Sequence, residues 1–271
     1  MPFDSVLSPH ISFAVQANSF YRELVSFVGP NDPDAEPGLG GKLLFIGELD
    51  ATGRALVVAG NVAGAASLAT TADRDGQKQA VRDGIVDFLV TSLDEALRIL
   101  KNEIRKSNTV AVCVASRLID VEHEMHERGV QADIWRGTMI ANTSSRDARG
   151  QQKSNAVSKP HEQDALISWT VSSAPARWLP KLDQLALDCV ETHDWPARRW
   201  LRLAPRYMGR LLTARLLKCD RIFATRFVER VHERVGHGEI ASEVHIQVSI
   251  GDQVEDHRFV PSSHREAEGQ L

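Results

Sequence analysis

A short stretch between residues 47 and 53 combines residue types that could hold a phosphate group at the start of a helix. Gly47 and Gly53 lie at its ends, and glycine allows the backbone to approach a pyrophosphate closely. Their separation is not that of a GxGxxG motif, and Glu48 and Asp50 place negative charge where a phosphate would lie. Two interpretations stay open: a dinucleotide-binding turn, or an α/β turn that binds nothing and uses Asp50 to cap the next helix.

The cysteine and histidine residues give weaker evidence for a functional site. No CxxC motif occurs, so the sequence predicts no structural zinc site. Cys219 lies between Lys218 and Arg221, cations that could activate a thiol, but we favour a half-buried structural cysteine. His123 and His126 have a spacing that can chelate a metal, although the glutamates beside them favour a solvated helix face. We therefore predict no metal site.

The strongest electrostatic feature is an arginine-rich helical run between residues 195 and 234. It could bind an anionic partner, since three acids stand against eleven cations: Arg198, Arg199, Arg202, Arg206, Arg210, Arg215, Lys218, Arg221, Arg226, Arg230 and Arg234. The alternative, which we favour, is that these arginines pair with acids of the N-terminal domain.

The elements that position the 47–53 turn read as a tight strand, turn and helix. Residues 43–46 form a short apolar run, and residues 54–66 form a small apolar segment typical of a helix pressed against a sheet. Its glycines, Gly60 and Gly64, each weaken a helix by roughly 1 kcal/mol, a loss that close backbone packing usually offsets. A second strand over residues 67–72 completes the unit.

Helix and strand patterns then alternate up to residue 135. We predict helices over 75–83, 92–106 and 117–128, the second with Ser92 and Glu95 as a capping box. Strands are predicted over 85–91, 109–115 and 130–135. A further helix is expected over 13–27 after a loosely ordered start. This alternation predicts an α/β fold, a Rossmann-like parallel sheet with helices on both faces, over residues 1–137.

The rest of the chain has a different character. Residues 138–163 are polar and predict a linker, whereas residues 164–251 predict a smaller, arginine-rich helical α+β module. Within it, strands over 165–171 and 243–250 could pair, and one or two helices are expected over 196–236. Residues 252–271 are predicted to be a flexible tail.

Composition bounds the class of protein. The 271 residues are 42% hydrophobic and 25% charged, with a net charge of −4, which fits an ordinary globular protein and does not favour nucleic-acid binding. We expect no signal peptide and no membrane span, and the three scattered cysteines fit a cytoplasmic location.

Four segments in order resemble the Rossmann-like domain of the urocanase (urocanate hydratase) family. They are AGAASL (63–68), VDFLVTSLDEALRIL (86–100), VAVCVA (110–115) and ERGVQADI (127–134). The resemblance implies a domain that holds NAD⁺, which this family uses as an electrophile. Aligned residues would then be cofactor-binding: Gly47, Ala51, Gly53, Thr71, Ala115 and Ser116.

The chain departs from the family where the cofactor would be held. The family's turn has the form GLGGMGG, and the aligned ELDATGR retains Gly53 alone of those glycines. An asparagine that the family uses at the cofactor is Ala115 here, and its catalytic domain with a reactive cysteine is not recognisable in residues 138–271. No catalytic residue is assigned.

Three functions remain open. The first is a relative without full hydratase activity that binds a nucleotide or small ligand at the carboxyl ends of the strands. The second is an NAD⁺-dependent hydro-lyase resembling urocanate hydratase. The third is a non-enzymatic interaction protein that uses the arginine-rich helices. A dinucleotide or small molecule and a second copy of the chain are the expected partners, and nucleic acid or a membrane is not.

Overall fold

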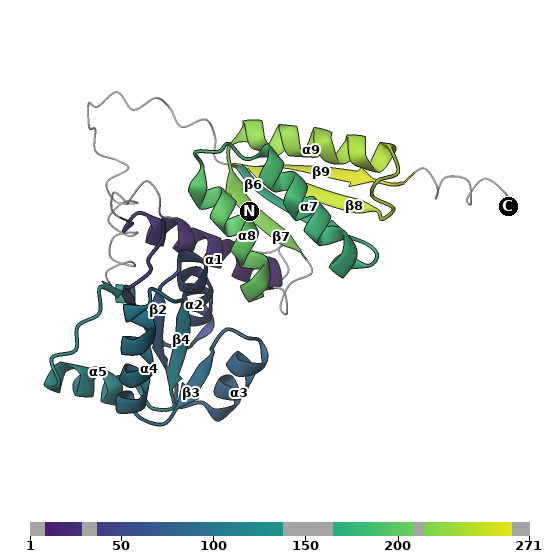
Figure 1. Cartoon of the computed structure of the whole chain (residues 1–271). Helices are drawn as coiled ribbons and strands as arrows, with labels where there is room; N and C mark the ends of the chain where they lie inside the picture. The colour runs from purple at the N-terminus through teal and green to yellow at the C-terminus, as the bar shows by residue number, and fades with distance from the viewer. Residues whose placement is uncertain (1–8, 29–36, 138–164, 209–213, 262–271) are drawn as a thin grey trace. The chain divides into compact units, whose positions relative to one another are not determined.

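The computed structural model describes residues 9–28, 37–137, 165–208 and 214–261 (Figure 1). The chain divides into two compact units: residues 19–157, and residues 1–18 together with 158–271. Helix α1 (Pro9–Val25) contains the boundary between the two units and begins before the predicted residue 13. The segment predicted to be a linker, 138–163, lies outside the described residues.

A parallel sheet forms the centre of the unit 19–157, with strand order β3-β4-β2-β1-β5. Its strands are β1 (Leu43–Glu48), β2 (Ala66–Thr70), β3 (Phe88–Val90), β4 (Val110–Val114) and β5 (Ile134–Trp135). All four neighbouring pairs are parallel. The chain leaves β1 toward β2 on one side and returns to β5 on the other, so the order of strands switches at β1. Open α/β sheets bind ligands at the carboxyl ends of the strands beside such a switch.

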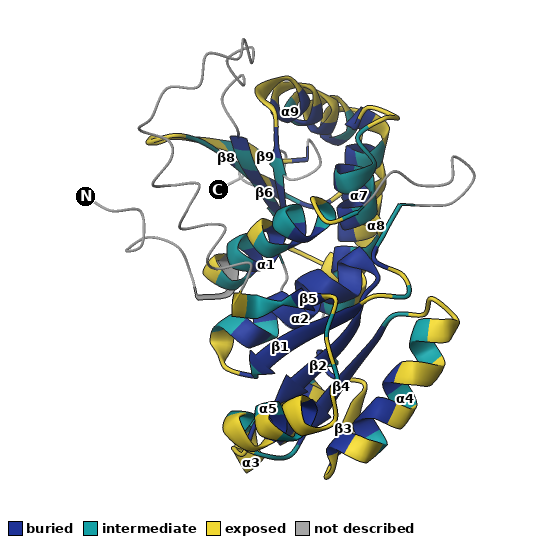
Figure 2. Cartoon of the chain, turned by 90° about the vertical axis from the view of Figure 1, so that its left-hand side faces the viewer, coloured by how far each residue is buried: buried dark blue, intermediate teal, exposed yellow. Residues whose placement is uncertain are grey.

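Helices cover both faces of this sheet, which confirms the predicted α/β, Rossmann-like fold. Helix α2 (Ala51–Ala63) packs on one face so closely that a Cβ on Gly60 would lie 2.8 Å from Leu44 Cδ2. Gly64 instead ends that helix in the left-handed conformation, three residues earlier than the sequence predicted. Figure 2 shows α2 and strands β1, β2 and β4 largely buried, whereas the outer sides of α3 (Arg74–Arg82), α4 (Leu93–Arg105) and α5 (Leu118–Glu127) are exposed.

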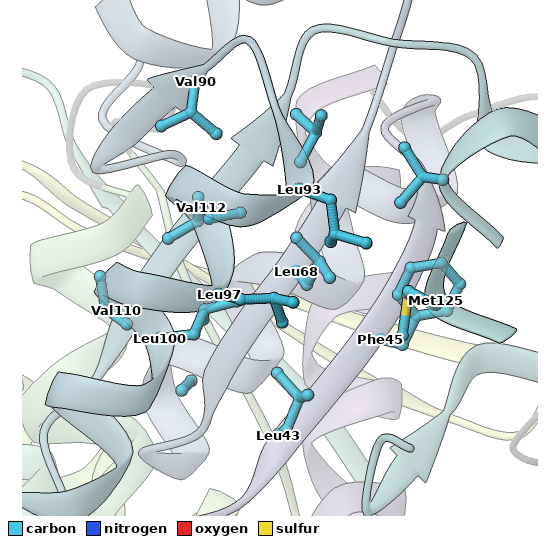
Figure 3. Close-up of a cluster of buried hydrophobic side chains, with 14 residues drawn as sticks. Leu43, Phe45, Leu68, Val90, Leu93, Leu97, Leu100, Val110, Val112 and Met125 are labelled. Atoms are coloured by element: carbon cyan, nitrogen blue, oxygen red, sulfur yellow. The ribbon is translucent and has the colours of Figure 1, made fainter. Parts of the chain in front are cut away.

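The opposite face carries the apolar cluster drawn in Figure 3. Leu93, Leu97 and Leu100 recur at helical spacing along α4 and meet alternate residues of the strands, while Met125 of α5 lies beside Phe45. Burying each such side chain contributes roughly 1.5–3 kcal/mol. Ser92 accepts a hydrogen bond from the Glu95 backbone N–H, as predicted for the start of α4.

The unit that holds residues 158–271 contains an antiparallel sheet with strand order β7-β6-β8-β9. Its elements are β6 (Ala165–Val171), α7 (Pro175–Cys189), α8 (Trp195–Met208), β7 (Arg215–Cys219), α9 (Arg221–Gly236), β8 (Val244–Ile250) and β9 (Gln253–Phe259). The predicted pairing of the 165–171 and 243–250 segments is confirmed, with Ile167 opposite Val248. Alternate residues of β6 and β8 are buried, because helices pack on one side of this sheet.

Two strands of this unit correct the sequence prediction. Residues 215–219 were expected to be helical but form β7, because pairing with β6 extends the sheet there. Residues 253–259 were expected to belong to a flexible tail but form β9, a polar edge strand that lacks a hydrophobic alternation. The two-residue connection Gly251–Asp252, with Gly251 at φ 57°, is the hairpin signal that was overlooked.

Candidate functional site

The site begins with a bulge at the carboxyl end of β1. The pairing of β1 with β2 shifts register between Phe45 and Gly47, and Gly47 adopts φ 75°, a left-handed conformation that side chains disfavour. The bulge turns the chain out of the sheet just before helix α2. Beyond it, the Leu49 N–H donates to the Thr70 carbonyl at 2.8 Å, which ties the turn to the end of β2.

Asp50 is the N-cap of helix α2, as the sequence predicted. Its side chain accepts a hydrogen bond from the Gly53 backbone N–H at 2.6 Å. A side chain on Gly53 would force the backbone to shift, because a Cβ would lie 2.2 Å from the Glu48 carbonyl oxygen. The glycine therefore allows the first turn of α2 to lie close to the Glu48 backbone. A helix N-terminus attracts anions, and in this protein the anion is the Asp50 carboxylate.

Arg136, which lies on the other side of the switch in strand order, contacts this turn. It follows β5 directly, and Nη1 and Nη2 lie 3.2 and 3.1 Å from the two Asp50 carboxylate oxygens. Nη1 also donates to the Glu48 carbonyl at 3.1 Å. The Arg136 side chain is 20% exposed, so it lies mostly within this turn. One arginine thus joins the ends of β1 and β5 to the N-terminus of α2.

The protonation state of Asp50 follows from these contacts. Partial burial by itself would raise the pKa of the carboxyl, but the hydrogen bonds from Arg136 and Gly53 and the positive charge of Arg136 outweigh it. The pKa of Asp50 is therefore lowered, and the group is ionised at neutral pH. A phosphate at this helix N-terminus would meet a fixed negative charge.

A second acidic residue follows β2, where dinucleotide-binding folds place the carboxylate that contacts a ribose. Asp73 accepts hydrogen bonds from the Asp75 and Gly76 backbone N–H groups, both at 3.1 Å, and so caps helix α3. Thr71 is buried, its hydroxyl accepts from the Asp73 N–H at 3.2 Å, and its carbonyl accepts from Gln77 at 2.8 Å. Both residues therefore serve the start of α3.

The strand β4 ends at the same edge. Ala115 and Ser116 follow it and are half-buried, with the Ala115 N–H donating to the Val90 carbonyl and the Ser116 N–H to the Val114 carbonyl. Cys113, within β4, is buried, and burial together with the negative charge of Glu48 raises its thiol pKa to about 12. The thiol is therefore protonated at neutral pH and is not a nucleophile.

The structure places the predicted residues at one edge. Gly47, Thr71, Ala115 and Ser116 lie at the carboxyl ends of neighbouring strands, and Ala51 and Gly53 lie in the first turn of α2. Sequence reasoning missed Arg136. A cation directly after the last strand was visible, but its meeting with Asp50 depends on β5 lying next to β1, which the local pattern does not encode.

The other candidates from the sequence do not gather into a site. Among the described residues, no group of three or more His, Cys, Asp or Glu is placed to hold a metal ion. His123 is exposed and lies 3.2 Å from Glu127 on its own helix. Cys189 and Cys219 are buried. No helix in the described ranges is long and apolar enough to cross a membrane.

Several of the arginines have partners inside their own unit. Arg198 donates to the Leu187 and Val190 carbonyls, and Arg226 donates to the Cys189 carbonyl, so both hold the carboxyl end of α7. Arg215 pairs with Asp183, whose carboxylate oxygen lies 2.9 Å away. Arg230 and Arg234 pair with Glu233 and Glu239.

The chain therefore contains a Rossmann-like α/β domain in which the polar groups at the carboxyl edge of the sheet pair with one another. The family model that matches the chain is described as the urocanase Rossmann-like domain and covers residues 32–145. This part of the chain is therefore a urocanase Rossmann-like domain, which confirms the relationship expected from the sequence.

The residues present do not fit the NAD⁺ that this family implies. A pyrophosphate needs unoccupied backbone N–H groups at the helix N-terminus and an electropositive environment. The Gly53 N–H is already bonded to an ionised carboxylate, and the acid after β2 caps α3. The cofactor's phosphates would have to displace the Asp50–Arg136 pair.

Proposed function

We propose that this protein is a binding protein built on a urocanase-type domain, and not an NAD⁺-dependent urocanate hydratase. The observation that carries the proposal is the Asp50 carboxylate, which takes the position of a phosphate between the Gly53 N–H and Arg136. The carboxylates of Asp50 and Asp73 at this edge repel phosphate groups, which favours a small ligand without phosphates, such as a nucleoside, over a dinucleotide. The buried free cysteines support a reducing, cytoplasmic location.

Thermal unfolding with different ligands tests this proposal. NAD⁺ and pyrophosphate at millimolar concentration should leave the melting temperature of the protein unchanged, since binding to the folded state would raise it. Adenosine, which lacks phosphate groups, probes the predicted preference and should raise it. A clear upward shift with NAD⁺ on the unmodified protein would overturn the proposal.

The variant Asp50→Ser sharpens the same experiment. Serine keeps a good N-cap but removes the negative charge, so Arg136 becomes available to an external anion. Pyrophosphate should then raise the melting temperature of Asp50→Ser. In Asp50→Ser with Arg136→Gln, the matched control, this gain should disappear because the cation is also absent. An equal response in both variants would mean that the pair does not control anion access.

Hydratase activity is the second candidate, favoured by the family relationship itself. Urocanate loses its near-ultraviolet absorbance when it is hydrated, so a flat absorbance trace with added NAD⁺ is the expected result. A decrease in absorbance that depends on the protein would establish lyase activity. That result would overturn the proposal of a binding protein without hydratase activity.

A further inference from the structure

A groove on the outer side of helix α4 carries positive charge that the fold does not neutralise. It is an open depression of about 570 Å³ in the unit 19–157, and not an enclosed cavity. Its lining comes from α4 and from the segment that follows α5: Asp94, Leu97, Arg98, Lys101, Asn102, Arg105, Arg128 and Val130.

One cation of the groove is already paired. Arg128 forms ion pairs with Asp94 and with Glu124, and these contacts lower the pKa of Asp94, the hydrogen bond and charge of Arg128 being the main causes. The Asp94 carboxylate and the Arg128 guanidinium therefore largely cancel. The net positive charge of the groove comes from the remaining cations.

Those remaining cations are Arg98, Lys101 and Arg105, all exposed on one side of α4. Among the described residues, no ion pair joins any of the three to a carboxylate, although Arg98 and Lys101 act on Asp94 through space. Glu103, the acid nearest in sequence to Lys101 and Arg105, is half-buried and accepts from Asn102, Lys106 and Asn108. Three neighbouring cations without ion-pair partners give this side of α4 a net positive charge.

The spacing of the three cations fits an extended acidic peptide. Along the helix axis Arg98 and Lys101 are separated by about 4.5 Å, and Lys101 and Arg105 by about 6 Å. Side chains on one side of an extended chain recur about every 6.6 Å, within reach of long, flexible cationic side chains. Leu97 and Val130 add apolar surface, so acidic residues alternating with aliphatic ones complement the groove.

The same lining disfavours nucleic acid. Among the described residues that line the groove there is no aromatic side chain on which a base could stack, and proteins that bind single-stranded nucleic acid normally use such stacking. The whole chain carries a net charge of −4, so a long polyanion that extends beyond the groove would be repelled. A short acidic segment meets only the local cluster of cations.

We propose that this groove, defined by Arg98, Lys101 and Arg105, is a docking site for an extended acidic segment of a partner protein. The proposal goes beyond the assignment made at the carboxyl edge of the sheet and does not depend on it. Either can fail alone, because the two experiments use different ligands and different residues.

The test uses a fluorescein-labelled peptide of alternating glutamate and valine, about ten residues long, followed by fluorescence anisotropy. The full-length protein should bind it, and binding should weaken as salt is raised to about 0.15 M and above. Replacing Arg98, Lys101 and Arg105 with glutamine should reduce the affinity by about tenfold or more, the combined effect of three exposed charge contacts.

A matched variant controls for net charge. Arg74→Gln with Lys78→Gln and Lys106→Gln removes three exposed cations of the same unit that do not line the groove, and it should bind the peptide within about twofold of the unmodified protein. Equal losses in the two triple variants, or no binding to the unmodified protein, would overturn the proposal. Tighter binding of an oligothymidylate of matched charge would overturn it too, because the groove would then be a nucleic-acid site.

Discussion

Two aspartate–arginine pairs, one in each unit, use the same chemistry for different ends. The Asp50 and Arg136 side chains lie 3.1 Å apart, and the Asp50 side chain is 49% exposed. The Asp183 and Arg215 side chains lie 2.9 Å apart and are 11% and 15% exposed, respectively. Asp50 is held by a helix N-terminus as well as by its arginine, and its pKa is lowered. Asp183 lies in a core, where burial outweighs Arg215 and the Trp169 indole N–H, and its pKa is raised.

The difference in exposure separates a pair at the edge of a sheet from a pair in a core. An ion pair near water at the end of a helix can open at small cost, since exposed pairs contribute roughly 0–1 kcal/mol. A buried pair cannot lose one member without leaving an isolated charge, which makes it part of the framework of the fold. The first pair therefore lies where an anion would approach the N-terminus of α2, and the second holds β7 against α7.

The largest effect is expected from breaking the buried pair. Arg215→Met leaves the Asp183 carboxylate uncompensated in the core and should lower the free energy of unfolding by about 3–5 kcal/mol. Urea denaturation followed by circular dichroism measures the loss. The double variant Asp183→Leu with Arg215→Met should regain most of it, because apolar residues of similar volume replace a buried pair well. A double variant as unstable as the single one would contradict this account.

Close packing at the candidate site gives the next largest effect. Gly53→Ala places a Cβ against the Glu48 carbonyl oxygen and should cost about 1–3 kcal/mol in the free energy of unfolding. The control is Gly236→Ala, at the end of α9, where an added Cβ would meet nothing within 4 Å. That change should be neutral or slightly stabilising. If both substitutions cost the same, the turn would be more pliable than the structure indicates.

Breaking the exposed pair should have a smaller effect. Asp50→Ala removes the N-cap of α2 and should cost about 1 kcal/mol, while Arg136→Gln leaves the cap in place and should cost less than that. Amide hydrogen exchange in the first turn of α2 should report the loss in both variants, with the core strands unchanged. A cost as large as that of Arg215→Met would show that the two pairs are equivalent after all.

The smallest expected effect is on the pH dependence of stability, which should have opposite signs for Asp50 and Asp183. The folded pKa of Asp50 is lowered, so its stabilisation is complete above the unfolded value of about 3.9 and is lost as the pH falls. The folded pKa of Asp183 is raised, so its contribution is complete below that value and is lost as the pH rises through the folded pKa.

Stability profiles of two variants measure this difference. Asp50→Asn should flatten the loss of stability on the acid side, and Asp183→Asn should steepen the rise of stability with pH. Urea midpoints between about pH 3 and pH 7 provide the comparison. Changes of the same sign in both variants would contradict the contrast between the pairs.

The local sequence determined the elements and much of the site's composition. Short β-branched runs, the Ser92 cap and the small residues of α2 predicted the alternation of the first unit, because these signals act over a few residues. The acidic turn and the role of Asp50 as a cap were visible for the same reason. The edge strand β9 was not, because a strand with both sides near solvent needs no hydrophobic alternation.

Tertiary structure alone decided where the strands lie and which charges meet. Arg136 is 86 residues from Asp50 in the chain, and it reaches that carboxylate because β5 pairs with β1. Similarly, β7 is a strand because β6 offers it an edge, and the three cations of α4 form a groove because the segment after α5 lies beside them. Hydrophobic periodicity depends on residues that are close in sequence. Strand order and ion pairing depend on contacts that form only in the folded protein.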